Sequence, residues 1–186
     1  MKEGIHVQRI STFKIIITAL FAALICVATM LVQIPIPATG GYANLGDGII
    51  LICAFLMHPL YAVMAAGVGS MLADLLSGYI TFAPGTLVIK AGVAMIAALI
   101  YRHFVNGQSP SGTMAVTAAA SIAAEAFMVL GYFLYEAVVL GAGFGAAGAL
   151  IGNVGQGVVG AIIACAVTPA LIRSEELREW MEKTGR

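Results

Sequence analysis

The chain has 186 residues, of which 61% are hydrophobic and only 10% are charged, and its mean hydropathy is +1.00. Soluble domains carry about 25% charged residues, so this composition excludes an ordinary soluble enzyme and indicates a protein that crosses a membrane several times. The formal net charge is zero and there is no basic patch with interleaved aromatic residues, so no nucleic-acid partner is expected.

The first apolar segment follows a basic N-terminal stretch and predicts a retained span over about residues 13–33, because it is too long for the core of a signal peptide. A loop rich in proline and glycine follows, from Pro35 to Asp47, and its length is typical of a functional lid. The next apolar run is interrupted at His58-Pro59. Since proline is favoured at a helix start, we divide the run into a short span (about 48–57) and a second one (about 59–77). One long helix kinked at the proline is the alternative.

Three more spans are expected over about residues 84–103, 113–138 and 149–172. With six spans, the chain ends and the loop after Arg102 lie on one side of the membrane and carry nearly all the lysine and arginine, while the loops on the other side carry none. The positive-inside rule then places both termini in the cytoplasm. The sequence therefore predicts an all-α integral membrane protein, with residues 1–186 forming one compact six-transmembrane-helix domain.

Two carboxylates and two tyrosines lie inside the fifth apolar segment, between Glu125 and Glu136. At 100° per residue, Glu125, Tyr132 and Glu136 share a narrow arc of the helix. A carboxylate costs about 2.5 kcal/mol or more at the bilayer centre, so such side chains usually face a bundle interior or an aqueous cavity. This face is predicted to form one wall of a binding site, and a paired structural Glu125 is the alternative.

Lys90 is the one base that does not belong to the cytoplasmic set, and it lies roughly two turns inside the span over residues 84–103. A lysine there either pairs with a carboxylate or contacts a ligand, and Asp74, Glu125 and Glu136 are the candidate partners. An ion pair that only fixes the helix register is the alternative. Asn153 and Gln156 share one face of the last span, where they either bind the ligand or join helices.

Polar residues within the apolar segments gather toward the outer face, which predicts a pocket open to the outside under a lid. The candidate substrate-binding residues are Tyr42, Asn44, Asp47, Lys90, Glu125, Tyr132, Tyr135, Glu136, Asn153 and Gln156. Aromatic rings with hydrogen-bonding groups suit a small, flat, polar solute. The sequence contains no HExxH, GxSxG or P-loop motif and no cysteine spacing typical of a metal site, so we expect no enzymatic activity, metal or cofactor.

These features resemble the substrate-binding S component of energy-coupling factor (ECF) vitamin transporters. The resemblance covers all six spans and is carried by the AxxxA spacing of Ala19 and Ala23 and by Asn44-Leu-Gly-Asp47, Ala73-Asp-Leu-Leu-Ser-Gly-Tyr79, Pro84-Gly-Thr-Leu-Val-Ile-Lys90, Gly131-Tyr-Phe-Leu-Tyr-Glu136 and Asn153-Val-Gly-Gln156.

The resemblance implies a multi-pass protein of the bacterial plasma membrane that binds a vitamin from outside. It further implies a transmembrane coupling subunit (T), contacted through Ala19 and Ala23, and two cytoplasmic ATPases, with the lid loop as a gate. The similarity is greatest to members for hydroxymethylpyrimidine or vitamin B6, with pantothenate and riboflavin as other options. Two further hypotheses are a stand-alone secondary transporter with a proton relay of Asp74, Glu125 and Lys90, and an assembly subunit without a ligand.

Overall fold

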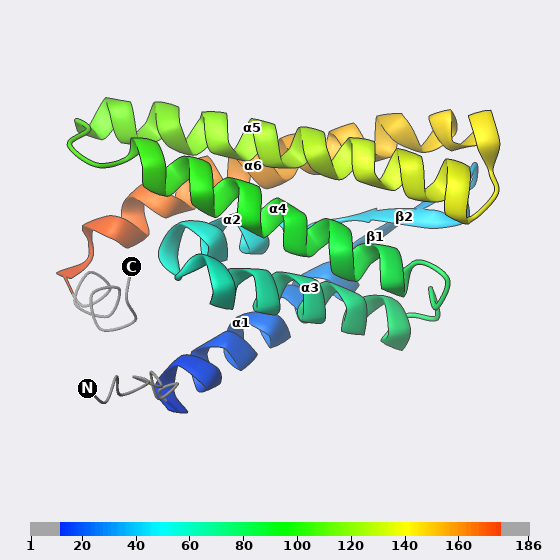
Figure 1. Cartoon of the computed structure of the whole chain (residues 1–186), viewed down its shortest axis with the longest axis horizontal. Helices are drawn as coiled ribbons and strands as arrows, with labels where there is room; N and C mark the ends of the chain where they lie inside the picture. The colour runs from blue at the N-terminus through cyan, green and yellow to red at the C-terminus, as the bar shows by residue number, and fades with distance from the viewer. Residues whose placement is uncertain (1–11, 176–186) are drawn as a thin grey trace, which may run out of the picture.

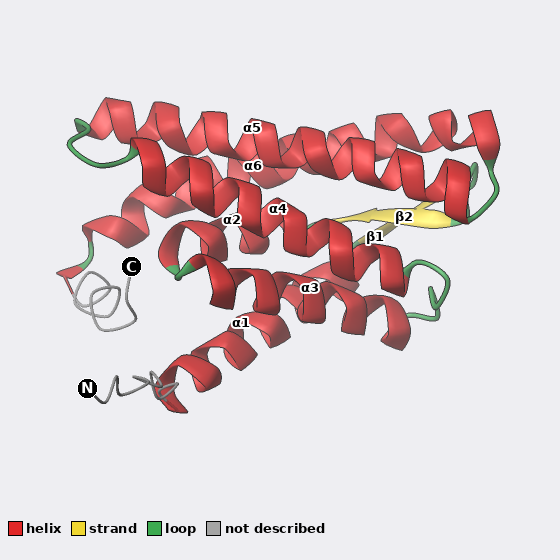
Figure 2. Ribbon diagram, viewed as in Figure 1, coloured by secondary structure: helices red, strands yellow, loops and turns green. Residues whose placement is uncertain are grey.

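The structure is a computed structural model that describes residues 12–175, which form six α-helices and one short β-hairpin (Figures 1 and 2). The helices are α1 (Thr12–Leu31), α2 (Gly46–Leu56), α3 (Pro59–Leu76), α4 (Ala83–Phe104), α5 (Pro110–Leu134) and α6 (Leu150–Arg173). The strands are β1 (Gln33–Ile36) and β2 (Gly41–Asn44). A π-helical turn, Tyr135–Val139, extends α5, and a 3₁₀ segment, Gly143–Ala149, leads into α6. The basic residues Lys2, Arg9, Arg178, Lys183 and Arg186, which contributed to the predicted orientation, lie outside the described residues.

Local turn signals determine where the helices begin. Between α2 and α3 the backbone is extended at Met57, and the backbone N–H of Leu60 donates to Nδ1 of His58 at 3.3 Å while Pro59 occupies the first helical turn. The N–H of Gly112 likewise donates to Oγ of Ser109 at 3.2 Å at the start of α5. Capping side chains and prolines satisfy or remove donors that a helix start leaves unpaired. The chain therefore divides at His58-Pro59 rather than continuing as one kinked helix.

Five helical stretches are long and apolar enough to cross a membrane: Thr12–Leu31, Pro59–Leu76, Ala83–Phe104, Pro110–Val139 and Gly143–Arg173. The remaining helix, α2, has 11 residues, or about 16 Å at 1.5 Å per residue, which is well short of the roughly 30 Å hydrocarbon core. Nearly every residue of α2 is buried, and the helix contacts α1, α3, α4 and α6. The apolar side chains of α2 therefore pack in the interior of the bundle.

The core around α2 is built largely from alanine. Buried alanines project from α3 (Ala62, Ala65, Ala66), α4 (Ala94, Ala97, Ala98) and α5 (Ala120, Ala124). Small side chains let helices approach closely, which is a main source of helix association within a membrane. The backbones of α1 and α3 approach closely, since a β-carbon added at Gly69 would lie 2.5 Å from the carbonyl oxygen of Ala22.

The described helices alternate in direction along the bundle. In Figure 1 the start of α1, the end of α6 and the α2–α3 and α4–α5 turns lie at the left-hand end, whereas the hairpin, the α3–α4 loop and the α5–α6 connection lie at the right-hand end. We call the latter the hairpin end. Both ends of the described chain therefore lie on the same side, opposite the hairpin end.

The predicted irregular lid is an antiparallel hairpin. Gln33 pairs with Asn44 and Ile36 with Gly41, and the connecting turn ends at Gly40, whose φ of +72° is a conformation that favours glycine. The described residues are otherwise helical apart from turns, so the all-α prediction holds for the membrane segments but missed this pair of strands. The sequence signal for these strands is weak, because two prolines lie within and beside the first strand and proline disfavours strand structure.

Candidate functional site

A nearly closed cavity lies at the hairpin end, between the hairpin and the ends of five helices. Its volume is about 20 Å³, roughly the space for one water molecule. The lining residues are Thr29, Ile36, Tyr42, Asn44, Ser70, Asp74, Phe82, Thr86, Lys90, Tyr132, Glu136, Asn153 and Gln156. Seven of the ten predicted substrate-binding residues are among them. A molecule larger than water can enter only if the hairpin or these side chains move.

Lys90 pairs with Asp47 rather than with Asp74, Glu125 or Glu136, which corrects the predicted partners. Its Nζ donates to Oδ1 of Asp47 at 2.5 Å, and both side chains are buried. Asp47 lies in the first turn of α2, where the helix dipole also favours a negative charge. The pair joins α2 to α4 and lies next to the cavity, of which Lys90 but not Asp47 is a lining residue.

Gln156 connects this ion pair to the hairpin. Its Nε2 donates to Oδ2 of Asp47 at 2.6 Å, and its Oε1 accepts from the backbone N–H of Asn44 at 2.7 Å. The side chain of Asn44 in turn accepts from the N–H of Gly46 at 2.9 Å. One amide on α6 therefore holds both strand β2 and the start of α2.

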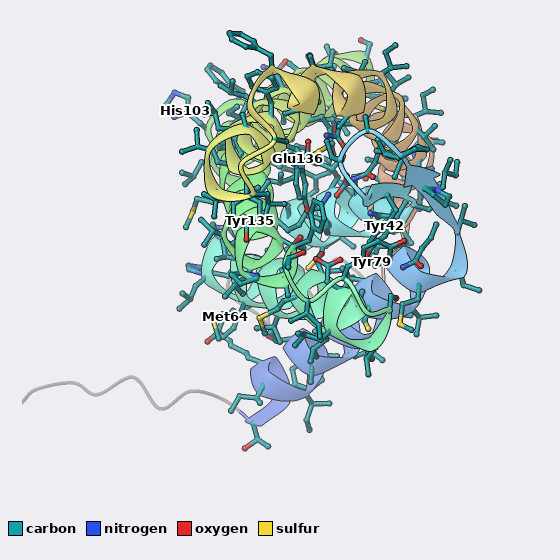
Figure 3. All side chains as sticks on the ribbon, turned by 90° about the vertical axis from the view of Figure 1, so that its right-hand side faces the viewer. Tyr42, Met64, Tyr79, His103, Tyr135 and Glu136 are labelled. Carbon is teal, nitrogen blue, oxygen red and sulfur yellow. The ribbon has the colours of Figure 1, made fainter. Side chains whose placement is uncertain are left out.

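Tyr42 makes a second connection between the hairpin and the bundle. Its hydroxyl donates to Oδ1 of Asp74 on α3 at 2.6 Å, and its ring lies 4.4 Å from that of Tyr79. Burial and the adjacent carboxylate raise the pKa of the Tyr42 phenol, so it remains the proton donor of this bond. Viewed from the hairpin end, Tyr42 and Glu136 lie inside the ring of helices, whereas His103 and Met64 lie outside it (Figure 3).

The far wall of the cavity comes from α4, α5 and α6. The hydroxyls of Thr86 and Tyr132 lie 3.0 Å apart, and Nζ of Lys90 lies 5.3 Å from the centre of the Tyr132 ring. Glu136 occupies the π-helical turn, a feature that is frequent at functional sites. Among the described residues, Oε2 of Glu136 and Nδ2 of Asn153 have no hydrogen-bond partner.

Besides Asp47, two predicted residues do not line this cavity. The hydroxyl of Tyr135 donates to the carbonyl of Thr81 at 2.7 Å and so braces the α3–α4 loop. Glu125 instead lies at an apolar groove of about 770 Å³ between α5 and α6. A β-carbon added at Gly160 of α6 would lie 3.0 Å from Cβ of Asp47 and 3.4 Å from Oε1 of Glu125, so these two side chains meet at the space that this glycine leaves open. Glu125 therefore also lies within electrostatic range of the Asp47–Lys90 pair.

Several residues that line the cavity are not among the predicted substrate-binding residues, above all Thr86, Ser70 and Asp74. Thr86 lies four residues before Lys90, and Ser70 lies four before Asp74, so each shares a helix face with a charge inside a span. That spacing is the signal that could have identified them. Thr29, Ile36 and Phe82 carry no such signal.

Replacing Gln156 with methionine is expected to loosen the hairpin, because methionine keeps the length of the side chain but forms neither hydrogen bond. Losing two bonds of about 1 kcal/mol each lowers the free energy of opening by about 2 kcal/mol, which corresponds to roughly thirtyfold faster amide exchange. Hydrogen–deuterium exchange of the peptide covering residues 33–44 measures this. Asn153→Leu is the matched control, since Asn153 lies one turn away on α6 and forms no described bond to the hairpin. Equal exchange in both variants would contradict the assignment.

Residues 12–175 contain no group of three or more histidine, cysteine, aspartate or glutamate side chains placed to hold a metal ion. Cys26, Cys53 and Cys165 are free thiols.

Comparison with known proteins identifies the kind of protein to which this cavity belongs. A family model described as "ECF-type riboflavin transporter, S component" matches residues 9–173. An uncharacterized protein of Pyrococcus woesei is 40% identical over 140 residues, which is 75% of this chain and 88% of the relative. The structure is also similar to a solved one titled "Structure and mechanism of the S component of a bacterial ECF transporter". Its TM-score is 0.63 at 18% identity, over 94% of this chain and 98% of that one, which shows a shared fold.

Proposed function

The chain belongs to the family of ECF-type riboflavin transporter S components, and we propose that it binds a small water-soluble vitamin or precursor of the hydroxymethylpyrimidine or pyridoxine type. The family consists of membrane subunits that bind a transported substrate and are not enzymes. The observation that carries the proposal is the buried polar cavity under a hairpin that hydrogen bonds of Tyr42 and Asn44 connect to the bundle.

A small ring suits this cavity better than a large one. Its volume of about 20 Å³ must grow for any vitamin, and the rearrangement needed is smaller for a single six-membered ring than for a three-ring system with a sugar-alcohol chain. Tyr42, Phe82 and Tyr132 supply aromatic surfaces, and the buried carboxyl, amide and hydroxyl groups supply hydrogen bonds. Within the proposal, these residues together with Asn44, Lys90, Glu136, Asn153 and Gln156 contact the ligand, and Asp47 positions Lys90.

The proposed topology is six crossings in a cell membrane with both termini in the cytoplasm, α2 being the short one. In support, Lys14, Arg102 and Arg173 belong to the helix ends opposite the hairpin end. Lys90 is the only lysine or arginine among the described residues nearer the hairpin end, and it is buried. The positive-inside rule then puts the hairpin and the cavity on the outer side.

ECF S components work with a T component and ATPases, and the proposed docking face for the T component is the one that carries Ala19 and Ala23. Both alanines are exposed on α1, whereas Ala22 faces α3 at Gly69. Large apolar side chains on the same helix, among them Ile16, Leu20 and Leu24, are also exposed. Only Ile25, Cys26 and Thr29 of α1 are buried within the described chain, which leaves the rest of this helix for lipid or a partner. ATP would be hydrolysed by the partner ATPases.

The proposal is tested by identifying the small molecule that remains with the detergent-purified protein. After denaturation, mass spectrometry is expected to detect a pyrimidine or pyridine alcohol. Recovery of riboflavin or pantothenate would leave the assignment as a vitamin-binding S component intact and would overturn the proposed substrate type.

A transport assay separates the proposal from a secondary transporter. Vesicles that contain the coupling subunit and both ATPases are expected to accumulate the vitamin only with ATP. Uptake by this chain alone, abolished when the proton gradient collapses, would favour the relay of Asp74, Glu125 and Lys90. The absence of binding across a vitamin panel would favour an assembly subunit.

A further inference from the structure

Two carboxyl groups line the cavity with unpartnered oxygens. Asp74 on α3 and Glu136 in the π-helical turn are only 3% and 2% exposed, and Oδ2 of Asp74 and Oε2 of Glu136 have no hydrogen-bond partner among the described residues. A buried acceptor left unsatisfied is costly, and in native proteins such atoms usually have a function. The hydroxyls of Thr86 and Thr39 lie near Asp74 and Glu136, respectively, but neither forms a described hydrogen bond with these oxygens. Both oxygens can therefore accept from a ligand.

The charge of Lys90 is already compensated. It is the only cationic side chain among the described lining residues, and its short contact is with Asp47, whose second oxygen accepts from Gln156. Lys90 also acts on Asp74 electrostatically, but it forms no described hydrogen bond with it. With Lys90 and Asp47 balancing each other, Asp74 and Glu136 give the cavity an excess of acidic groups.

From these contacts we propose that the cavity selects a positively charged or amino-substituted heteroaromatic ring and rejects vitamins that carry a carboxylate or phosphate. The inference rests on the proposed function and narrows its substrate class. The ligand donates N–H or O–H groups to Asp74 and Glu136, and the free Nδ2 of Asn153 donates to a ring nitrogen or hydroxyl of the ligand. The rings of Tyr42, Phe82 and Tyr132 flank the cavity and favour a flat cation through their negative faces.

Electrostatics makes this selection strong. Charges that approach each other within a few ångströms at low dielectric interact far more than in water, and Asp74 and Glu136 are both nearly inaccessible to solvent. A cation gains from both carboxylates and from two charge-assisted hydrogen bonds. An anion opposes the ionisation of both carboxyl groups and finds no uncompensated base among the described lining residues.

The test is a matched set of ligands that share one ring. Pyridoxamine, pyridoxine and 4-pyridoxate differ only in the group at position 4, which is an aminomethyl, a hydroxymethyl or a carboxylate. A second pair consists of 4-amino-5-hydroxymethyl-2-methylpyrimidine and its 4-hydroxy analogue. Calorimetric titration of the purified full chain is expected to show at least tenfold tighter binding of the amine in each set. The carboxylate is expected to bind at least tenfold more weakly than pyridoxine.

Two substitutions, Glu136→Gln and Asp74→Asn, test whether the preference for amines depends on the carboxyl groups of the cavity. Each is expected to reduce the amine-to-alcohol ratio to about threefold or less, because the amide keeps a hydrogen-bond acceptor but removes the negative charge that favours the amine. Glu175→Gln is the matched control, an exposed carboxylate beyond the far end of α6, and is expected to leave the ratio unchanged. The melting temperature without ligand verifies that each variant is folded.

Three outcomes would overturn the inference: 4-pyridoxate binding as well as pyridoxine, full discrimination surviving in both cavity variants, or no binding in either ligand set. Recovery of pyridoxine from the purified protein and its ATP-driven uptake, without a preference for the amine in either ligand set, would leave the proposed function intact and overturn only the charge selection. An absence of any ligand and of any uptake would overturn both.

Discussion

Replacing Lys90 with methionine is expected to destabilise the protein by about 3–5 kcal/mol, because it leaves Asp47 as a buried charge with only Gln156 as a partner. Asp47 is fully buried, so solvent cannot replace the lost ammonium. Equilibrium unfolding in mixed micelles measures the loss. The variant is also expected to release the small molecule that copurifies with the protein, since Lys90 lines the cavity.

A double variant separates the cost of the unpaired charge from the loss of packing. Lys90→Met combined with Asp47→Asn removes both charges and keeps a hydrogen-bond acceptor for Gln156, so it is expected to recover at least half of the lost stability. Lys14→Met is the matched control, because Lys14 lies near the start of α1 and has only a ring contact with Tyr61 at 5.7 Å. It should change the free energy of unfolding by about 1 kcal/mol or less. A double variant no more stable than Lys90→Met would contradict the ion-pair explanation.

Replacing both Ala19 and Ala23 with leucine is expected to abolish vitamin uptake while leaving ligand binding intact. The two alanines are exposed on α1 and lie one turn apart, so two leucines would hold a partner helix away from this face. Copurification with the coupling subunit and ATPases should fall at least tenfold, as measured by the subunit ratio after affinity capture. The dissociation constant of the isolated subunit should change less than threefold, because neither alanine lines the cavity.

Ala115 and Ala119 provide the matched control. They have the same spacing and are also exposed, but they lie on α5. Their conversion to leucine adds the same apolar volume and is expected to leave uptake unchanged. Equal loss of uptake in both double variants would indicate a general effect of bulk at the lipid surface. Loss of ligand binding in the α1 variant would indicate that this face packs within the subunit.

The sequence by itself determined the positions of the helices. Long apolar runs with few charges, divided by prolines at positions 59, 84 and 110, specify helices whose backbone hydrogen bonds are satisfied locally, as a membrane requires. It also pointed to the polar residues of the cavity. Charged and amide side chains such as Lys90, Glu136 and Asn153 are rare in apolar segments, and their cost forces them toward a shared interior.

Only the tertiary structure decided how these side chains combine. Lys90 has acidic residues within reach on several helices, and the partner it adopts, Asp47, is 43 residues away, so helix crossing and depth rather than spacing selected it. Glu125 shares a helical arc with Tyr132 and Glu136, yet α6 passes close to it at Gly157 and Gly160, so it lies at the groove outside the cavity. The hairpin pairs over the cavity because α2 is short and buried, which brings Asn44 within reach of Gln156. Periodicity describes one helix at a time, whereas a binding cavity depends on distances between helices.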